Sequence, residues 1–441
     1  MNKYNTHTQF LDIWISKIPA HWQAHKMKHL FSERSEKGYP NEPLLVASQN
    51  MGVVPKNVYG NRTVEAQKDL HLLKLVRVGD FVISLRSFQG GLEYAYYQGI
   101  ISPAYTILIP HEPMSGSYFR YLAKSKPFIG LLTLCVTGIR EGQNIDYAKL
   151  KNHLLPVPPR EEQDQIVRFL DWKVSSINKL INIKHKEISE LNESLNTKLR
   201  DVLLSVPDVK EVPLKRICSV PMTDGPHETP TFVDSGIPFV SAEASHDGRI
   251  HLDECRGFIT REQHEVYCQK VRPHKNDIFI VKSGSTTGKT VMVDFDEKFS
   301  IWSPLALVRC NNLAMPRYVF FYCTSVMFQK QVRDNWSFGT QPNIGMGVLE
   351  NLRLPLPEIE EQRAIVDTLD AYWSKVLQVK CNLKKQIEEF QSLKTRIIAD
   401  AVTGKIDVRG IEIPEYEFVD EDNDNVDENL EQGADDPPEE E

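Results

Sequence analysis

A glycine-rich segment at residues 282–290 has the residue types and spacing that come nearest to phosphate chemistry. It reads Lys-Ser-Gly-Ser-Thr-Thr-Gly-Lys-Thr and follows an apolar run. A nucleotide-binding P-loop needs four residues between its glycines, because the backbone amides of the loop cradle the phosphates. Only three residues separate Gly284 from Gly288. The spacing therefore argues against an ATP site. It predicts a basic, hydroxyl-rich loop that can reach phosphates and base edges.

Two histidine–cysteine pairs have the residue types of a zinc site. They are His251 with Cys255 and His264 with Cys268. The two pairs lie close together in sequence, and the first half of the chain has no counterpart. We therefore predict no metal site and interpret these residues as surface histidines and half-buried thiols.

Motifs of other catalytic sites do not occur in the chain. Amino-methyltransferases carry Asn-Pro-Pro or Asp-Pro-Pro followed by Tyr or Phe, and the nearest match, at residues 436–439, lacks the aromatic residue. No glycine-rich cofactor turn opens a predicted helix. Paired carboxylates lie mainly on predicted helices, where a solvated face explains them. The sequence predicts a non-catalytic binding protein that holds no cofactor of its own.

The charge of the chain is unevenly distributed. Its formal net charge is −8, but fourteen acidic residues and no basic residue follow position 414. Residues 1–414 therefore hold 52 basic and 46 acidic residues, a net charge of +6. The acidic segment 413–441 cannot bury apolar area, so we expect it to be disordered. A DNA-mimicking or partner-binding role is the alternative for it.

The sequence carries no sign of secretion or membrane insertion. The longest apolar stretch is far shorter than the roughly 20 residues that a membrane span needs. Seven cysteines are scattered without a disulfide-like spacing. We expect a cytoplasmic protein without membrane contact.

The chain contains an internal repeat. When the sequence is shifted by 199 positions, residues 144–171 align with residues 343–370, and fourteen of these 28 positions are identical. Weaker similarity extends upstream, where residues 78–83 match residues 275–280. A repeat of nearly 200 residues is too long for a solenoid and indicates two copies of a whole domain with its helix.

Each copy has two parts. Short β-type runs punctuated by Gly and Pro, with a few helices between them, predict a mixed α/β domain. A Pro-x-Pro exit follows, and then about 45 residues without Pro or Gly, in which apolar side chains recur every three or four positions. This pattern predicts a coiled-coil helix. Two such helices in one chain can pair antiparallel; two independent helices lining separate cores are the alternative.

The predicted fold class is α+β, mixed: two pseudo-symmetric α/β domains separated by a long antiparallel two-helix coiled coil. The predicted boundaries are 1–159 for the first domain, 160–206 for the first helix, 207–357 for the second domain, 358–412 for the second helix with a closing segment, and 413–441 for the acidic tail.

The repeated motifs resemble those of the specificity (S) subunits of type I restriction-modification systems. Both copies carry Asn-Ile, then Leu-Pro-x-Pro, then Glu-Glu-Gln at the start of the long helix. The second helix ends in Ala-Val-Thr-Gly-Lys-Ile-Asp-Val-Arg at residues 401–409, which is also similar to that family. The resemblance covers roughly residues 15–412, and the acidic tail departs from the family pattern.

The resemblance implies a function. Each domain is then a target recognition domain that reads one half of a bipartite site in double-stranded DNA, and the helices set the distance between the half-sites. Two methyltransferase (M) subunits would dock on the helices with S-adenosylmethionine and methylate adenine. Restriction (R) subunits, with ATP and Mg²⁺, would complete the endonuclease. The mildly positive body suits a chain whose partners supply further phosphate contacts.

We predict the base-reading residues from loops that repeat in position but differ in sequence, because two different half-sites need different side chains. In the first domain these residues are Arg86, Ser87, Gln89, Arg140 and Gln143. In the second domain they are Lys282, Ser283, Thr286, Thr287, Lys289, Thr340 and Gln341. Two other functions stay open: a coiled-coil scaffold with two modules that bind something other than DNA, and the specificity subunit of a fused type II system.

Overall fold

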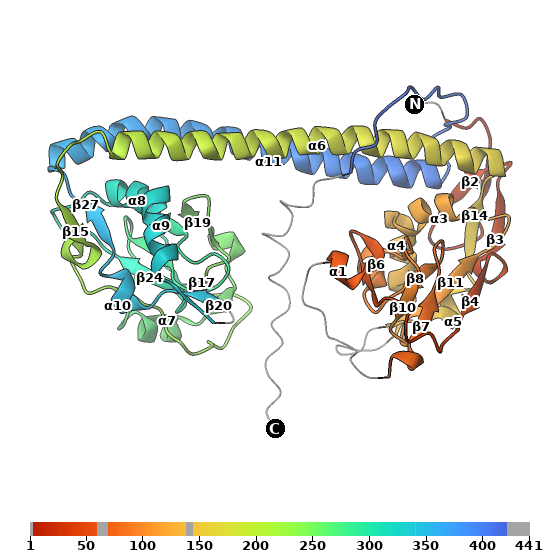
Figure 1. Cartoon of the computed structure of the whole chain (residues 1–441), viewed down its shortest axis with the longest axis horizontal. Coiled ribbons are helices and arrows are strands. Elements are labelled where there is room, and N and C mark those ends of the chain that lie inside the picture. Colours follow the sequence, from red (N-terminus) through yellow and green to blue (C-terminus); the bar gives the residue numbers. More distant parts are fainter. Residues whose placement is uncertain (1–2, 60–68, 138–143, 340, 421–441) are drawn as a thin grey trace. The chain divides into compact units, whose positions relative to one another are not determined.

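The structure is a computed structural model that describes residues 3–59, 69–137, 144–339 and 341–420 of the chain. The chain divides into two compact units, each with mixed α/β content (Figure 1). Of the described residues, those within 3–183 and 386–420 form unit 1, and those within 184–385 form unit 2. None of the helices in the described ranges is both long and apolar enough to cross a bilayer.

Unit 1 is built on a four-stranded antiparallel sheet. Its strands, in spatial order, are β4 (Phe31–Arg34), β11 (Thr106–Pro110), β8 (Phe81–Ile83) and β9 (Glu93–Tyr94). Two-stranded ladders accompany it: β1 (His7–Gln9) with β2 (Lys17–Pro19), β3 (Gln23–Lys26) with β14 (Leu154–Val157), β5 (Leu45–Ser48) with β6 (Gly52–Pro55), β7 (Lys74–Val76) with β10 (Gly99–Ile101), and β12 (Val136–Thr137) with β13 (Asn144–Ile145). The apolar runs that predicted strands form the centre of the sheet, where Phe81, Val82 and Leu108 are fully buried.

Unit 2 has two sheets of more than two strands. The first has six strands in the order β16 (Thr223–Asp224), β24 (Leu305–Val308), β21 (Ile278–Val281), β22 (Thr290–Met292), β19 (Arg249–Ile250) and β18 (Ser245–His246). The second has the order β20 (Gly257–Ile259), β17 (Ile237–Val240) and β23 (Ser300–Ile301). Two ladders complete the unit: β15 (Glu211–Pro213) with β27 (Arg353–Pro355), and β25 (Ser337–Phe338) with β26 (Pro342–Asn343). All four residues of β21 are buried, which is why this run is apolar at every position.

Short helices accompany the sheets. Those of unit 1 are η1 (Met27–His29), α1 (Lys56–Tyr59), η2 (Leu70–Leu72), α2 (Ser87–Gly90), α3 (Gly116–Ala123), α4 (Lys126–Leu134) and α5 (Tyr147–Leu150). Those of unit 2 are η3 (Leu214–Ile217), η4 (Leu252–Glu254), α7 (Arg261–Tyr267), α8 (Pro316–Thr324), α9 (Val326–Asn335) and α10 (Met346–Leu349).

Each unit contains two consecutive helices separated by a single break, α3 with α4 and α8 with α9. A buried serine marks both breaks. The hydroxyl of Ser125 donates to the carbonyl of Leu122, and that of Ser325 donates to the carbonyl of Tyr322, each at 2.7 Å. A side chain that bonds to the preceding turn in this way replaces the continuing helix. In the first copy, Pro127 also favours a new start.

Two long helices, α6 (Arg160–Leu203) and α11 (Ile359–Val402), contain 44 residues each, which confirms the two uninterrupted helices predicted from the sequence. Each contributes residues to both units. Within unit 1 the two segments run antiparallel. Asn178 of α6 accepts from Lys394 of α11 at 3.2 Å, whereas Gln165, earlier in α6, donates to the carbonyl of Val408, beyond the end of α11.

The apolar seam of the helices also packs against a domain. In unit 2, Leu195 and Leu199 of α6 and Ile365 and Leu369 of α11 lie in one buried cluster with residues of α8, including Phe320. Ser194 and Tyr372 add a hydrogen bond of 2.7 Å between the two helices. Within this unit the helices therefore contact each other and line the domain core at the same time.

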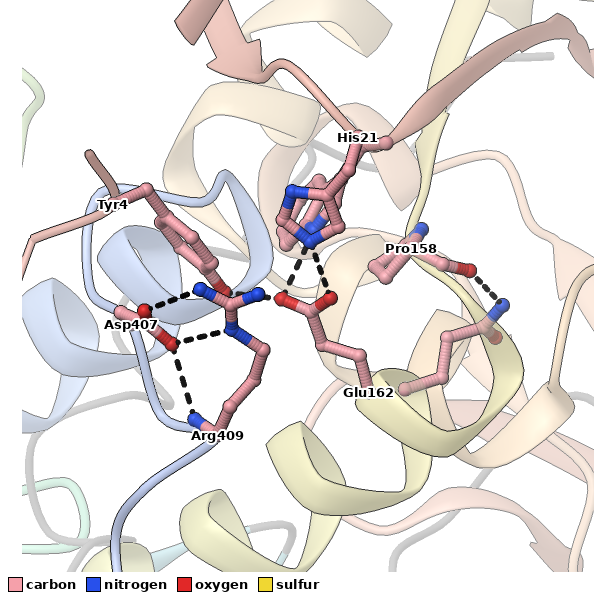
Figure 2. A network of polar contacts seen from close by, with 8 residues as sticks. Tyr4, His21, Pro158, Glu162, Asp407 and Arg409 are labelled. Atoms are coloured by element: carbon pink, nitrogen blue, oxygen red, sulfur yellow. Dashed lines mark hydrogen bonds and ion pairs between the residues drawn. The ribbon is translucent and has the colours of Figure 1, made fainter. Parts of the chain in front are cut away.

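Glu162, at the start of α6, joins the N-terminal segment to the helix (Figure 2). Its carboxylate accepts from the hydroxyl of Tyr4 at 2.5 Å and from the indole N–H of Trp22 at 3.0 Å, and it lies 2.7 Å from Nε2 of His21. The Glu162 side chain is almost fully buried. Burial, together with this carboxylate, raises the pKa of Tyr4, so the phenol stays protonated and remains a donor.

The segment after α11 closes onto the same region. Gly404 has a φ of +73°, and a Cβ on it would lie 2.2 Å from Cδ of Pro19, so a side chain there would be both strained and crowded. Arg409 is paired with Asp407 at 2.7 Å and lies over the ring of Tyr4 at 5.1 Å (Figure 2). These contacts account for the Gly-Lys-Ile-Asp-Val-Arg sequence that closes the second helix.

The acidic segment is partly ordered. The hydroxyl of Ser175 on α6 donates to the carbonyl of Glu417 and accepts from the backbone N–H of Val419, and Asn178 donates to the carbonyl of Val419. The expectation of disorder from residue 413 therefore does not hold for residues 417–420, because polar side chains of α6 bind their backbone. Residues 421–441 lie outside the described residues.

Candidate nucleic-acid interface

The repeat fixes each domain to its long helix through an equivalent glutamine. Gln163 and Gln362 are the aligned third residues of the two Glu-Glu-Gln motifs, and both are fully buried. The Gln163 amide donates to the carbonyls of Pro113 and Pro158 and accepts from the backbone N–H of Ser115. The Gln362 amide makes the same set with Leu313, Pro357 and Met315, at 2.8–2.9 Å. Because each side chain satisfies three backbone groups, it holds the domain exit, the helix start and the preceding loop together.

A buried ion pair supports the central strand in both copies. The aligned residues Asp80 and Asp277 precede β8 and β21, and both are almost fully buried. Asp80 binds Arg34 of β4 with two hydrogen bonds, at 2.7 and 3.1 Å. Asp277 binds Arg309, which follows β24, with two hydrogen bonds of 2.7 Å. The carboxylate occupies the same position in each repeat, but its arginine comes from a different strand.

In unit 2 the glycine-rich loop leaves β21 and folds against the β25–β26 hairpin. The N–H of Gly284 donates to the carbonyl of Pro342 at 3.1 Å, and the N–H of Ile344 donates to the carbonyl of Lys282 at 2.8 Å. Gly284 and Gly288 have φ values of +100° and +95°, which require glycine. The structure therefore brings the predicted loop residues and the hairpin that carries Gln341 to one end of the sheet.

The predicted reading residues of unit 2 differ in exposure. Lys289 and Gln341 are exposed, and Ser283 and Thr286 are half-buried. Thr287 is buried, and its hydroxyl donates to the carbonyl of Gly284 at 2.8 Å. Thr340 lies outside the described residues.

Lys282 lies in an ion-pair cluster. Its Nζ is 3.0 Å from Oδ2 of Asp224, and Lys270 binds the other carboxylate oxygen at 2.6 Å. Burial raises the pKa of Asp224, but the hydrogen bonds from Lys270 and Lys282 outweigh it, so the pKa lies below its ordinary value. Lys282 is therefore a paired cation, whereas the Lys289 side chain is exposed to solvent.

In unit 1 the equivalent loop leaves β8 and forms α2. Arg86 and Gln89 are exposed. Ser87 is fully buried, and its hydroxyl accepts from the backbone N–H of Ser84 at 2.8 Å. Gln49 donates to the carbonyl of Arg86 at 3.3 Å. Arg140 and Gln143 lie outside the described residues.

Ser87 and Thr287 differ from the other predicted reading residues in their burial. Ser87 and Thr287 have buried hydroxyls that bind the backbone of their own loops. A hydroxyl in this position cannot reach a base while the loop keeps its shape. We therefore assign both side chains to shaping the loops, and Arg86, Gln89, Lys289 and Gln341 to the exposed surface.

Sequence reasoning missed the side chains that support the loops. Asp224 pairs with Lys282. Gln49 donates to the carbonyl of Arg86, and Lys124 donates to the carbonyl of Gln49 at 3.0 Å. These residues lie far from the loops in sequence. The one local signal was the Asp-Gly-Pro turn signature at residues 224–226.

A buried carboxylate, Glu93 of β9, contacts Lys124 at 2.7 Å through Oε2. Its Oε1 is buried and has no hydrogen-bond partner among the described residues. Burial, opposed by Lys124, raises the pKa of Glu93 to about 7. The folded unit therefore holds a proton here at a pH where the unfolded chain has released it.

We expect this group to make unit 1 less stable as the pH rises. Its pKa is higher in the folded state than its ordinary value of 4.5, so its stabilising contribution is complete below that value and is lost as the pH passes through about 7. Denaturant titrations between pH 4 and 8 should show a smaller loss of stability in Glu93→Gln than in the wild type. Glu33→Gln, which changes an exposed carboxylate of β4, is the control. Identical pH slopes in the wild type and Glu93→Gln would contradict the assignment.

The two histidine–cysteine pairs are arranged differently from a four-ligand site. His264 is buried; its Nδ1 bonds to the hydroxyl of Ser300 at 2.8 Å, and its Nε2 lies 3.4 Å from Sγ of Cys268. His251 lies instead against His246, with ring centroids 3.8 Å apart. Among the described residues, the four predicted candidates do not gather around one point.

Comparison with known proteins points to one family. Residues 208–389 match the family described as "Type I restriction modification DNA specificity domain". The type I restriction enzyme MjaVIII specificity subunit of Methanocaldococcus jannaschii is 25% identical over 355 residues, covering 76% of this chain and 81% of the relative. The putative type I restriction enzyme MjaX specificity subunit of the same organism is 22% identical over 441 residues, covering 90% and 96%.

A solved structure supports the fold. It comes from work on complex assembly and conformational transition of the type I R-M system, and it matches with a TM-score of 0.60 and 18% identity, covering 88% of this chain and 99% of that one. The match over residues 208–389, the specificity-subunit relatives and the repeated Leu-Pro-x-Pro and Glu-Glu-Gln motifs make the chain similar to the specificity subunits of type I restriction-modification systems.

Proposed function

We propose that the chain binds DNA through two recognition domains, each of which reads one half of a bipartite site. The observation that carries this proposal is the contrast within the repeat. Gln163 and Gln362 make equivalent hydrogen bonds, and Asp80 and Asp277, which occupy the same position of the repeat, each bind an arginine, whereas the loops that follow β8 and β21 differ in sequence. A common frame with divergent exposed side chains suits the reading of two different half-sites.

The long helices suit the role of a spacer between the recognition domains. A helix of 44 residues, at about 1.5 Å per residue, is roughly 65 Å long. We propose that α6 and α11 pair as an antiparallel coiled coil that separates the domains and sets the distance between the half-sites. Recognition domains that read the same face of a duplex need a spacing near a whole helical turn, about 34 Å or a multiple of it.

The chain is proposed to be the non-catalytic member of a larger enzyme. Its relatives are named as specificity subunits of type I restriction enzymes, which implies further subunits. We propose that two methyltransferase subunits bring S-adenosylmethionine and dock on the helices, and that restriction subunits bring ATP and Mg²⁺. Methylation requires the target base to be flipped out of the duplex, and in this arrangement the methyltransferase subunits would flip it.

Methylome sequencing tests this function. A host that carries this chain with a matching methyltransferase subunit should show adenine methylation at a bipartite motif. Replacing residues 207–357 with the second domain of a relative should change one half of the motif and leave the other intact. A motif that changes in both halves, or no sequence-specific methylation at all, would refute the assignment.

We expect Arg86→Ala and Lys289→Ala each to weaken sequence-specific DNA binding by about 1–3 kcal/mol, because each removes an exposed cation from a reading loop. Fluorescence anisotropy of the assembled complex with specific and scrambled duplexes would measure the loss. Arg77→Ala and Lys275→Ala are matched controls, since these cations precede β8 and β21 and pair with Glu36 and Asp296. Equal losses in variants and controls would show a general charge effect.

A further inference from the structure

We propose that His246, His251 and Glu254 bind a first-row transition metal ion, with Zn²⁺ the best fit. The three residues belong to a short segment of unit 2 that contains the β18–β19 hairpin and η4. One donor atom from each residue lies within 4.8 Å of the others. In the part of the chain that the structure describes, no other group of three or more His, Cys, Asp or Glu residues meets this spacing.

An unpartnered nitrogen is the second observation that points to a ligand. Nε2 of His251 is buried and makes no hydrogen bond among the described residues. Buried polar atoms are nearly always satisfied, and an imidazole nitrogen without a partner is a natural metal ligand. His251 is also anchored through its backbone N–H, which donates to the carbonyl of Ala244 at 2.9 Å, so the histidine is held in place.

His246 has the surroundings of a supported metal ligand. Its Nε2 lies 2.9 Å from Oε2 of Glu254, and its Nδ1 lies 3.4 Å from Oδ2 of Asp247. Metal-bound histidines commonly donate their second ring N–H to a carboxylate, which fixes the tautomer and strengthens the ligand. Asp247 is in the position to do this while Nε2 and Glu254 face the ion.

The donor set selects the kind of ion. Two imidazoles and one carboxylate suit Zn²⁺ and its neighbours in the first transition row, whereas Ca²⁺ and Mg²⁺ prefer oxygen ligands. The imidazole rings stack with 10° between their planes, so their lone pairs do not converge until one ring turns. His246 and Glu254 are on the surface side, with 27% and 52% of their side chains exposed, and have room to adjust.

Metal binding at this site would stabilise the contact between the second domain and α11. Asp247, beside the proposed ligand His246, pairs with Lys384 of α11 at 2.9 Å. A Cβ on Gly248 would lie 2.9 Å from the ring of Trp373, so the hairpin tip packs closely on that helix. A cavity of about 400 Å³ between the hairpin and α11 is lined partly by His251. An ion that joins the hairpin to η4 would therefore stiffen the support of the domain on its helix.

Metal titration of the full chain, without a histidine tag and stripped of metal, tests the proposal. Zn²⁺ competed against a chromophoric chelator should bind with one equivalent. His251→Gln and Glu254→Gln should each weaken this binding about ten-fold or more. His227→Ala is the control, because His227 is an exposed histidine of the same unit outside the cluster. Unchanged affinity in both ligand variants, or no stoichiometric binding, would overturn the proposal.

Co²⁺ spectroscopy separates this site from a cysteine site. Cobalt bound by nitrogen and oxygen should show visible d–d bands without an intense thiolate charge-transfer band. A thiolate band would show that a cysteine is among the ligands and would overturn the assignment. Zn²⁺ should also raise the midpoint of thermal unfolding of the wild type but not of Glu254→Gln, whose substitution lies on the surface and leaves the core intact.

Discussion

Asp80→Asn is expected to lower the free energy of unfolding of unit 1 by about 3 kcal/mol, because it removes the buried counter-charge of Arg34 and leaves only the partly exposed Glu36 carboxylate, 2.6 Å away, to pair with the guanidinium. Arg34 is 9% exposed and Asp80 is 2% exposed, so water cannot take the place of the lost partner. Asp80 also accepts from the backbone N–H of Arg77 at 2.8 Å, and that contact weakens too. The buried position of the pair makes this one of the two most damaging single changes we predict.

Hydrogen–deuterium exchange can measure the effect unit by unit, since a chain with two compact units need not unfold in one step. Peptides covering β4, β8 and β11 should lose protection, and those covering β21 and β24 should not. Asp277→Asn is the matched variant in unit 2. Its loss should be smaller, about 1–3 kcal/mol, because the Arg309 side chain is 24% exposed and retains some hydration.

Removing both charges of unit 1 distinguishes an unpaired charge from lost packing. The double variant Arg34→Met with Asp80→Ala should be more stable than Asp80→Asn alone, because no buried charge is left without a partner. A double variant that is less stable than the single one would show that shape, and not charge, dominates at this position.

Glu162→Ala is the second change with a large expected effect, about 3–5 kcal/mol of unit 1 stability. It leaves the Tyr4 hydroxyl, the Trp22 indole and the His21 ring without their shared acceptor. Hydrogen bonds to a charged group contribute about 1.5–3 kcal/mol each, and donors left buried add a desolvation cost. Because three residues of the N-terminal segment meet at this carboxylate, the segment should detach from the start of α6 (Figure 2).

Limited proteolysis and exchange of peptides covering β1 and β2 would report this release. Glu361→Ala is the control offered by the repeat, since Glu361 is aligned with Glu162. Glu361 is exposed, and its carboxylate accepts from the backbone N–H of Glu358 at 3.0 Å, at the start of α11. Its loss should cost about 1 kcal/mol or less, as for a helix cap. Equal destabilisation by the two substitutions would refute the role given to Glu162.

The sequence by itself determined the features that depend on local pattern. The spacing of apolar residues and the lack of Pro and Gly predicted both 44-residue helices, because helical periodicity is a property of neighbours along the chain. The fourteen identities of the repeat located the domain exits and helix starts. The break between α3 and α4 depends on the Ser125 hydroxyl, which donates to the carbonyl of Leu122, and the apolar pattern of the sequence does not signal it.

Only the tertiary structure showed which aligned residues of the two copies have the same burial and make the same contacts. Glu162 and Glu361 are identical in sequence, yet one is buried beneath an N-terminal segment and the other faces solvent. Asp80 and Asp277 take their arginines from different strands.

The predicted reading loops were found in sequence because they diverge between the copies. Only folding showed that Ser87 and Thr287 are buried while Arg86 and Lys289 are exposed. Local sequence specifies the spacing of apolar residues in a helix or strand and the residues at which it begins and ends. Burial and pairing depend on residues far away in the chain, which a single sequence does not connect.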